Sequence, residues 1–443
     1  MRKKLLEIIC LYQSSFISFF LKLIRSPFLA LQIVAYLNSD ELGYWYTYQA
    51  IGGYIVLCEF GISKLISIYT SSFIVEFRST SFSNKIELFR IHSSRVVLSI
   101  IFYLIIYLIS IFILFFFSFL FFDKWGMNIL IPFLFYLFGS ALSLFYNFYI
   151  NLLYGVGLIK KRNHLENWYG LISFILILFF LYFGFKLYSL GLALLMSNIF
   201  IYLFHYNYIK YWSNRIKKYY SLIYFKKILL SLDNIHWKYF TTNIISLYIT
   251  SSLTIFVMKF FNPILAGRIG LTLFILNSIT GISNVFFYTR YPEILFLIQQ
   301  NKLIELKKIT KYLLTSMLTV FLLCVIFLII LIKLLTYYNI NFIKNLLSIQ
   351  DIIFISIVNF CLIIIGLLAQ IVRGYKVEPY WKLSIIQVFT STFLYFISYH
   401  FNNIHYYFIL DSFLHIFILL PLSIYFGKFY ILKIFKSNST FVK

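Results

Sequence analysis

Residues 36–51, YLNSDELGYWYTYQAI, align without a gap to residues 260–275, FFNPILAGRIGLTLFI. The alignment places Asn38 on Asn262 and Gly43 on Gly267, and its offset of 224 residues is about half of the chain. That offset corresponds to six apolar segments, so both copies would cross a membrane in the same direction. Parallel six-plus-six repeats, related by an axis along the membrane normal, are one plan of secondary transporters. The repeat therefore predicts two six-helix lobes.

The composition indicates a chain that is embedded in a membrane. Hydrophobic residues make up 62% and charged residues 12% of it, whereas soluble domains have about 45–50% and about 25%. Apolar runs recur from end to end, as in transmembrane helices, and the first is followed by many others, unlike a cleaved signal peptide. We expect an all-α polytopic protein with twelve spans, at about residues 9–37, 43–73, 96–122, 129–153, 168–186, 189–209, 236–258, 266–290, 311–334, 349–372, 381–400 and 404–427.

The basic residues predict the orientation. Alternate loops and both chain ends hold 28 of the 38 Lys and Arg residues. Because cytoplasmic loops carry the excess of Lys and Arg, both termini are expected in the cytoplasm. A cytoplasmic linker at 216–235 would separate an N-terminal lobe, residues 1–215, from a C-terminal lobe, residues 236–443. The net charge of +24 lies mainly in short loops between spans, which argues against nucleic acid as a partner.

Motifs of metal, nucleotide or catalytic sites are absent from the sequence. The four cysteines stand singly in apolar stretches, as buried inert thiols do. There is no G-x-x-x-x-G-K-[ST], G-x-S-x-G or H-E-x-x-H, the patterns of phosphate-binding loops, serine hydrolases and zinc peptidases. We expect no metal, no cofactor and no enzymatic activity.

The first span carries a polar stripe. Its members recur at steps of three, four and seven residues, which places them on one side of a helix. They are Ser15, Ser18, Lys22, Arg25, Gln32 and Tyr36. Pro27 lies within the stripe, and a proline inside a helix removes a hydrogen bond and kinks it. Broken helices often mark the binding sites of transporters.

Lys22 and Arg25 are expected at membrane depth. Fourteen residues separate Arg25 from Asp40, and they span roughly 21 Å, short of the roughly 30 Å hydrocarbon core. Each charge would cost about 2.5–3.5 kcal/mol if it faced lipid, and a water-filled cavity removes most of that cost. The alternative reading places the pair at the cytoplasmic edge, with side chains that reach the headgroups.

Three segments resemble the polysaccharide flippases of the MOP superfamily, the Wzx-type O-antigen transporters. Residues 42–63, LGYWYTYQAIGGYIVLCEFGIS, resemble the start of the second helix of that family, with Gly43-Tyr44-Trp45 and a later Phe60-Gly61. AGRIGLTL (266–273) and YPEILFLIQQNKLIELKK (291–308) resemble the start and the end of the eighth helix. In span count and spacing the resemblance extends over the whole chain.

This resemblance implies two lobes around a central cavity that is lined by helices 1, 2, 7 and 8. It implies alternating-access transport of a polyprenyl-pyrophosphate-linked oligosaccharide, such as an O-antigen unit of lipopolysaccharide, across the bacterial cytoplasmic (inner) membrane. The glycan polymerase and the chain-length machinery would be partners. It also implies that cations on these helices bind the pyrophosphate, and here they are Lys22, Arg25, Lys64, Lys238 and Arg268. For Lys238 and Arg268, near opposite membrane edges, a role as interface anchors is equally open.

Other polar residues in the spans have two readings each. Asn277, Thr280 and Asn284 share one face of span 8, and with Gln32 they would line the cavity or join helices. Glu59 lies in the middle of span 2, where a carboxylate must pair, with Arg25 as a candidate, or take up a proton.

In span 12, Asp411 and His415 lie four residues apart on one face. Histidine titrates near physiological pH, so the two residues would form a proton relay for coupling, or else a polar pair between helices.

Two other functions stay open at this stage. A multidrug or organic-cation exporter of the same superfamily should have an acidic cavity, whereas cations outnumber acids in these spans. An integral-membrane polysaccharide polymerase or glycosyltransferase should carry catalytic carboxylates beside a large outer loop, and the predicted outer loops are short.

Overall fold

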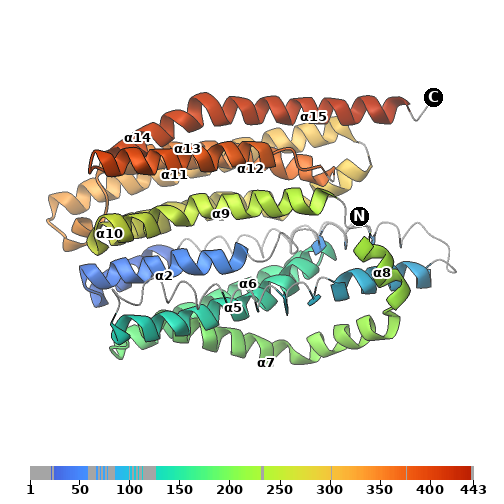
Figure 1. Cartoon of the computed structure of the whole chain (residues 1–443), viewed down its shortest axis with the longest axis horizontal. Helices are drawn as coiled ribbons and strands as arrows, with labels where there is room; N and C mark the ends of the chain where they lie inside the picture. Colours follow the sequence, from blue (N-terminus) through green and yellow to red (C-terminus); the bar gives the residue numbers. More distant parts are fainter. Residues whose placement is uncertain are drawn as a thin grey trace, which may run out of the picture. The chain divides into compact units, whose positions relative to one another are not determined.

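The computed structural model describes residues 24–57, 85–98, 126–230, 234–300, 302–375 and 377–440, with residue 21 and some residues between 66 and 112. Within these ranges the chain is helical and has no strand, so the all-α fold class is confirmed. The named helices, shown in Figure 1, are α2 (Ser39–Leu57), α5 (Met127–Gly155), α6 (Ile159–Tyr182), α7 (Tyr188–Tyr219), α8 (Leu222–Leu230), α9 (Asn234–Phe260), α10 (Pro263–Gln299), α11 (Leu303–Tyr337), α12 (Ile349–Gly374), α13 (Trp381–His400), α14 (His405–Leu414) and α15 (Leu420–Thr440).

Every span expected from residue 129 onward coincides with a helix. Six helices in the described part of the chain are long and apolar enough to cross a membrane, namely Met127–Gly155, Lys160–Tyr182, Pro263–Tyr291, Leu303–Tyr337, Ile349–Gly374 and His405–Tyr430. The last expected span differs from a regular α-helix, because a π-helical turn, η2 (His415–Leu419), joins α14 to α15. A short 3₁₀ helix, η1 (Asn341–Asn345), precedes α12.

The chain divides into two units. Unit 1 comprises Met1–Ser18 and Ile51–Trp237, and unit 2 comprises Phe19–Ala50 and Lys238–Lys443. The boundary at residues 50 and 51 falls inside α2, and α8 occupies part of the segment expected as a linker. The lobes 1–215 and 236–443 stay a prediction.

In unit 1, α5 and α7 pack through small residues. A methyl group at Gly191 would lie 2.5 Å from the backbone nitrogen of Tyr136, so the two helices touch backbone to backbone there. The side-chain amide of Asn198 donates to the carbonyl oxygen of Gly139 at 3.1 Å across the same contact. Close approach through small residues and interhelical hydrogen bonds are the usual means of helix association in lipid.

In unit 2, α12 packs against α10, α11, α14 and α15, and Figure 1 shows these helices running alongside one another. An ion pair closes the end of α12 that is predicted to face the cytoplasm: the guanidinium of Arg373 donates to both carboxylate oxygens of the buried Glu378. The hydroxyl of Tyr380 then donates to the carbonyl oxygen of Ser423 in α15 at 3.1 Å. These bonds fix the α12–α13 connection against α15.

The two aligned stretches of sequence lie against each other at the starts of α2 and α10. A methyl group at Gly43 would lie 2.2 Å from the carbonyl oxygen of Pro263, and one at Gly267 would lie 3.0 Å from the nitrogen of Gly43. Similarly, a methyl group at Gly270 would lie 2.2 Å from Tyr46, its counterpart at the same offset of 224 residues. Two pairs of equivalent residues therefore touch, which is what a local two-fold axis between α2 and α10 produces.

We expect Gly43→Ala to destabilise the protein by about 1–3 kcal/mol, because the new methyl group meets backbone atoms that have no room to move. Gly366→Ala is the matched control: it also lies inside a helix, yet no atom beyond its own stretch of helix lies within 4 Å of a methyl group at that position. That change should be neutral or stabilise by about 0.5–1 kcal/mol. Thermal unfolding in detergent measures both, and equal midpoints for the two variants would contradict the close contact.

Candidate functional site

The helix at residues 24–36 carries the described half of the predicted polar stripe. One of its faces is buried, through Ala30, Ile33 and Leu37, and another exposes Ile24, Phe28 and Leu31. Arg25 and Gln32 are half-buried and lie between these two faces. These two polar residues lie along the border between the buried face and the exposed apolar face of the helix. A residue that lines a cavity would lie along such a border. Lys22 lies outside the described residues.

The predicted polar residues of α10 fall into two groups. Asn277 is exposed, while Thr280 and Asn284 are half-buried on the same face, and the hydroxyl of Thr280 donates within its own helix to Leu276. Arg268 is exposed but lies nine residues before Asn277, two and a half turns away and therefore on the opposite side of the helix. The helix thus does not bring Arg268 to the face of Asn277 and Asn284.

Three predicted site residues remain: Lys238, Lys64 and Glu59. Lys238 lies half-buried in the second turn of α9, where its carbonyl oxygen accepts from the hydroxyls of Thr241 and Thr242. Lys64 and Glu59 lie outside the described residues.

The hydroxyls of α9 join helices. Tyr248 shares a hydrogen bond with Thr392 of α13 at 3.0 Å, and Ser252 shares one with Tyr395 at 2.7 Å. The ring of Phe256 stacks on Tyr395 with centroids 4.9 Å apart. For these residues of α9 the structure favours a role in helix packing over a role in lining a cavity.

Asp411 and His415 are brought together in the interior of unit 2. The residues are 7% and 0% exposed. Nδ1 of His415 lies 2.9 Å from the carbonyl oxygen of Asp411 and 3.2 Å from its carboxylate Oδ1. The first contact has hydrogen-bond geometry and the second does not, so Oδ1 has no hydrogen-bond donor among the described residues.

The sequence did not single out Gln387, which completes this group. Its side-chain nitrogen in α13 lies 3.1 Å from Nε2 of His415. The only available signal was a lone amide within an apolar span, and nothing in the sequence pairs it with a residue 28 positions later. Nδ1 of His415 therefore contacts Asp411 of α14, and Nε2 contacts Gln387 of α13. Together these contacts fix the orientation of the imidazole ring.

A second His–Asp pair marks the predicted outer end of the same unit. Nδ1 of His405, at the start of α14, contacts Oδ1 of Asp351 in the first turn of α12. The hydroxyl of Ser348 donates to Oδ2 of Asp351 at 2.6 Å and also caps α12 by accepting from the Asp351 backbone. Both carboxylate oxygens of Asp351 thus have partners.

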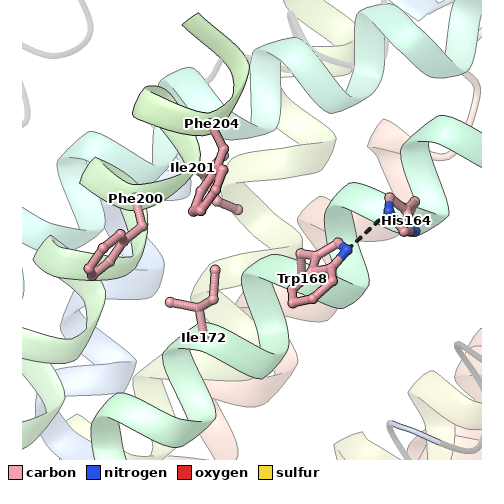
Figure 2. A pocket seen from close by; sticks show the side chains of 6 residues that line it. All are labelled: His164, Trp168, Ile172, Phe200, Ile201 and Phe204. Atoms are coloured by element: carbon pink, nitrogen blue, oxygen red, sulfur yellow. Dashed lines mark hydrogen bonds between the residues drawn. The ribbon is translucent and has the colours of Figure 1, made fainter.

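Unit 1 contains an apolar groove of about 500 Å³ between α6 and α7. Trp168 and Ile172 of α6 face Phe200, Ile201 and Phe204 of α7 across it (Figure 2). At one end the indole N–H of Trp168 donates to Nε2 of His164 at 3.0 Å. Exposed cations stand within two turns of that end: Lys160 and Lys161 at the start of α6, and Lys210 on α7. The groove therefore has apolar walls and a basic rim.

Comparisons with known proteins identify the fold. The chain is similar to the outward-facing conformation of a multidrug resistance MATE family transporter of the MOP superfamily, with 14% identity, a TM-score of 0.62 and coverage of 96% of this chain and 95% of that chain. It is similar to a MOP superfamily transporter from Pyrococcus furiosus, for which reverse polarity of the binding pocket suggests a different function, with the same identity, TM-score and coverage. A mutant of the Vibrio cholerae MATE transporter VcmN gives 13% identity, a TM-score of 0.61 and 97% coverage of both chains.

No protein-family model and no curated protein matches the chain. At these identities the likeness concerns the fold alone. The chain has the fold of MATE transporters in the MOP superfamily, over nearly its full length.

A double-mutant cycle of Ser252→Ala and Tyr395→Phe should show a coupling of about 0.6 kcal/mol, and at most about 1.7 kcal/mol, in the free energy of unfolding in micelles. Ser278 is the control, because its hydroxyl donates only within its own helix, to Phe274. Ser278→Ala and Tyr395→Phe should be additive. Additivity in the first cycle as well would contradict the packing role of the α9 hydroxyls.

Proposed function

We propose that this protein is a flippase that moves a polyprenyl-pyrophosphate-linked oligosaccharide, an O-antigen or similar envelope glycan unit, across the bacterial cytoplasmic membrane. The polarity of the spans carries the proposal. Arg25 and Lys238 are half-buried. Among the described residues, the acids six residues into a candidate span each have a basic neighbour: Asp411 lies beside His415, and Glu166 pairs with Arg162. A cavity lined by such helices attracts an anion.

Arg25 is the best placed of these cations to hold a pyrophosphate. The planar guanidinium presents forked donors that match phosphate oxygens, and such charge-assisted bonds are the stronger ones. Gln32 lies seven residues further along the same stripe, and its amide can hydrogen-bond a sugar hydroxyl. The two residues together suit a ligand with an anionic and a sugar portion.

The groove of unit 1 supports a lipid-linked rather than a free substrate. Its aromatic and branched walls suit a hydrocarbon chain, and burying each methylene group contributes about 0.8 kcal/mol. The cations near one end of the groove would attract a lipid with an anionic headgroup before it reaches Arg25, because membrane-surface Lys and Arg attract such headgroups. We propose that the polyprenyl tail docks in the groove.

A multidrug exporter is the second candidate, since the multidrug resistance MATE transporter has the same fold. An organic cation would need an acid that faces the cavity, and Asp411 is buried instead. A polymerase or glycosyltransferase stays a weaker alternative, which sugar transfer by the purified protein would support. The glycan polymerase and chain-length machinery remain proposed partners.

We expect Arg25→Ala to slow flipping of a fluorescent polyprenyl-pyrophosphate-linked saccharide in proteoliposomes by about tenfold or more. This corresponds to a charge-assisted hydrogen bond of about 1.5–3 kcal/mol. Arg25→Lys keeps the charge but loses the fork, so its rate should fall between those of Arg25→Ala and the wild type. Lys344→Ala, which removes an exposed cation of η1, is the control and should not change the rate.

The same vesicles distinguish the candidates when they are loaded with a cationic dye. Flipping of the saccharide without dye transport supports the proposal. Dye transport without saccharide flipping would overturn it in favour of the exporter.

A saccharide substrate with a photoreactive prenyl chain should label the groove residues Trp168 and Phe204 more strongly than Phe327 and Phe393, which are also exposed but lie outside it. An excess of unlabelled polyprenyl phosphate should suppress the groove labelling, because the tail occupies a defined site. Mass spectrometry locates the labelled residues. Equal labelling of all four aromatics would show ordinary lipid contact and refute a tail site.

A further inference from the structure

We propose that Asp411 and His415 form a proton-binding site within unit 2, and that binding and release of one proton there drive the transport cycle. The coupling role rests on the transport function proposed above, whereas the proton site itself does not. The site binds a proton that comes from water on one side of the membrane and leaves to water on the other, so no further reactant is needed.

Because the pair is buried, its protonation state decides whether a net charge lies inside the protein. An ionised carboxylate without a partner is expensive inside a protein, and Oδ1 of Asp411 has no hydrogen-bond donor in the described structure. With one shared proton the pair is electrically neutral, either as a carboxylic acid beside a neutral imidazole or as a carboxylate beside an imidazolium. Without that proton it carries one buried negative charge, and with two it carries one positive charge.

The contacts of His415 accommodate both neutral arrangements. Nδ1 carries a hydrogen in each, because it donates to the carbonyl oxygen of Asp411. Nε2 faces the side-chain amide of Gln387. An amide offers a donor nitrogen to a neutral imidazole and, after a half-turn, an acceptor oxygen to an imidazolium. Gln387 therefore stabilises either state without moving a helix.

Glu378, the buried acid of the α12–α13 connection, differs from Asp411 in its partner. Glu378 is even more buried than Asp411, but Arg373 donates to both of its oxygens. Arginine does not lose its proton in proteins, so Glu378 faces a permanent positive charge. Asp411 faces an imidazole, the side chain that does exchange a proton near neutral pH.

The neighbouring elements place no fixed charge against the pair. On α12 the titratable groups are Asp351 in the first turn, paired with His405, the buried thiol of Cys361, and Arg373 at the far end, paired with Glu378. Tyr395 of α13 and Tyr407 of α14 lie within electrostatic range of Asp411. The fixed charge of α13 is Lys382 in its first turn, five residues before Gln387. On α15 the first charged residue, Lys428, comes thirteen positions after His415.

Polar and aromatic groups lie between the pair and the predicted outer end of α14. His405 and Asp351 lie at that end, and Asp411 and His415 follow about 9 Å and about 15 Å further along the helix. The rings of Tyr407 and Tyr395 stack at 5.0 Å between these levels, and the hydroxyl of Tyr395 bonds to Ser252.

The π-helical turn η2 is the element of the backbone that can change conformation when the pair binds or releases a proton. It begins at His415 itself, and π turns inside α-helices are rare and concentrate at functional sites. A site of this composition also favours a proton over Na⁺, because hard cations require several oxygen ligands, whereas this pair supplies a single carboxylate and an imidazole.

The test is pH-titrated infrared difference spectroscopy of the full chain in lipid, which reads carboxyl and imidazole bands together, without substrate. The wild type should show the carboxyl and imidazole bands changing together in one transition of the titration. Asp411→Asn should abolish it, and His415→Gln provides a second variant in case the first does not fold. Glu305→Gln, which removes an exposed carboxylate beside Lys302, should leave it intact. A transition that persists in both Asp411→Asn and His415→Gln, or its absence from the wild type, would overturn the proton site.

The coupling role is then measured as saccharide flipping with and without a pH gradient. We expect the gradient to change the wild-type and Glu305→Gln rates by at least several-fold and to leave the Asp411→Asn rate unchanged. An unchanged wild-type rate would refute coupling. If no saccharide is moved at all, the proposed substrate fails while the infrared transition still decides the proton site.

Discussion

The contact between the starts of α2 and α10 is the constraint on which the arrangement of unit 2 depends. In lipid, helices gain little by burying apolar surface against each other, so they associate where small residues let their backbones meet. Gly43, Gly267 and Gly270 make that meeting, and two of the contacts join residues that the internal repeat makes equivalent. The helix at 24–36 and the first half of α2 belong to unit 2 together with α10. The polar stripe with Arg25 and the face of α10 with Asn277 therefore belong to the same unit.

Much of the fold was predictable from the sequence, because the membrane imposes both helical structure and length. Spans from 129 onward, the helix-starting Asn38 and Asn262, and the repeat all have local or periodic signatures. Asn262 accepts from the backbone of Leu265, and Asn38 lies directly before α2. The site was less predictable. The i, i+4 pair of Asp411 and His415 is local, whereas Gln387 and the Asp351–His405 pair connect positions 28 and 54 residues apart, with no periodicity to reveal them.

The exposure of the polar residues in the spans distinguishes those that join helices from those that can line a cavity. Ser252 and Tyr248 carry hydroxyls, which are costly in lipid, and both are bonded to α13. Asn277 is exposed on α10, and Asn284 is half-buried on the same face. A hydroxyl satisfies itself within its own helix or with one neighbour, whereas an amide has both donors and acceptors to satisfy. Exposure rather than residue type marks the face of Asn277, because Asn198 is also an amide and joins α7 to α5.

Charge placement gives the transport cycle a physical basis. A pyrophosphate that binds beside Arg25 brings negative charge into a low-dielectric region, where the cost of each uncompensated charge is several kcal/mol. The Asp411–His415 pair changes its own charge by one unit when it gains or loses a proton. The field of one buried charge weakens with distance but is little screened by salt inside the membrane, so the two proposed sites would influence each other without a direct contact. A protonated, neutral pair is compatible with an occupied anion site, and a deprotonated, negative pair opposes it. The sign of this coupling follows from Coulomb's law and makes proton release a means of expelling the anion.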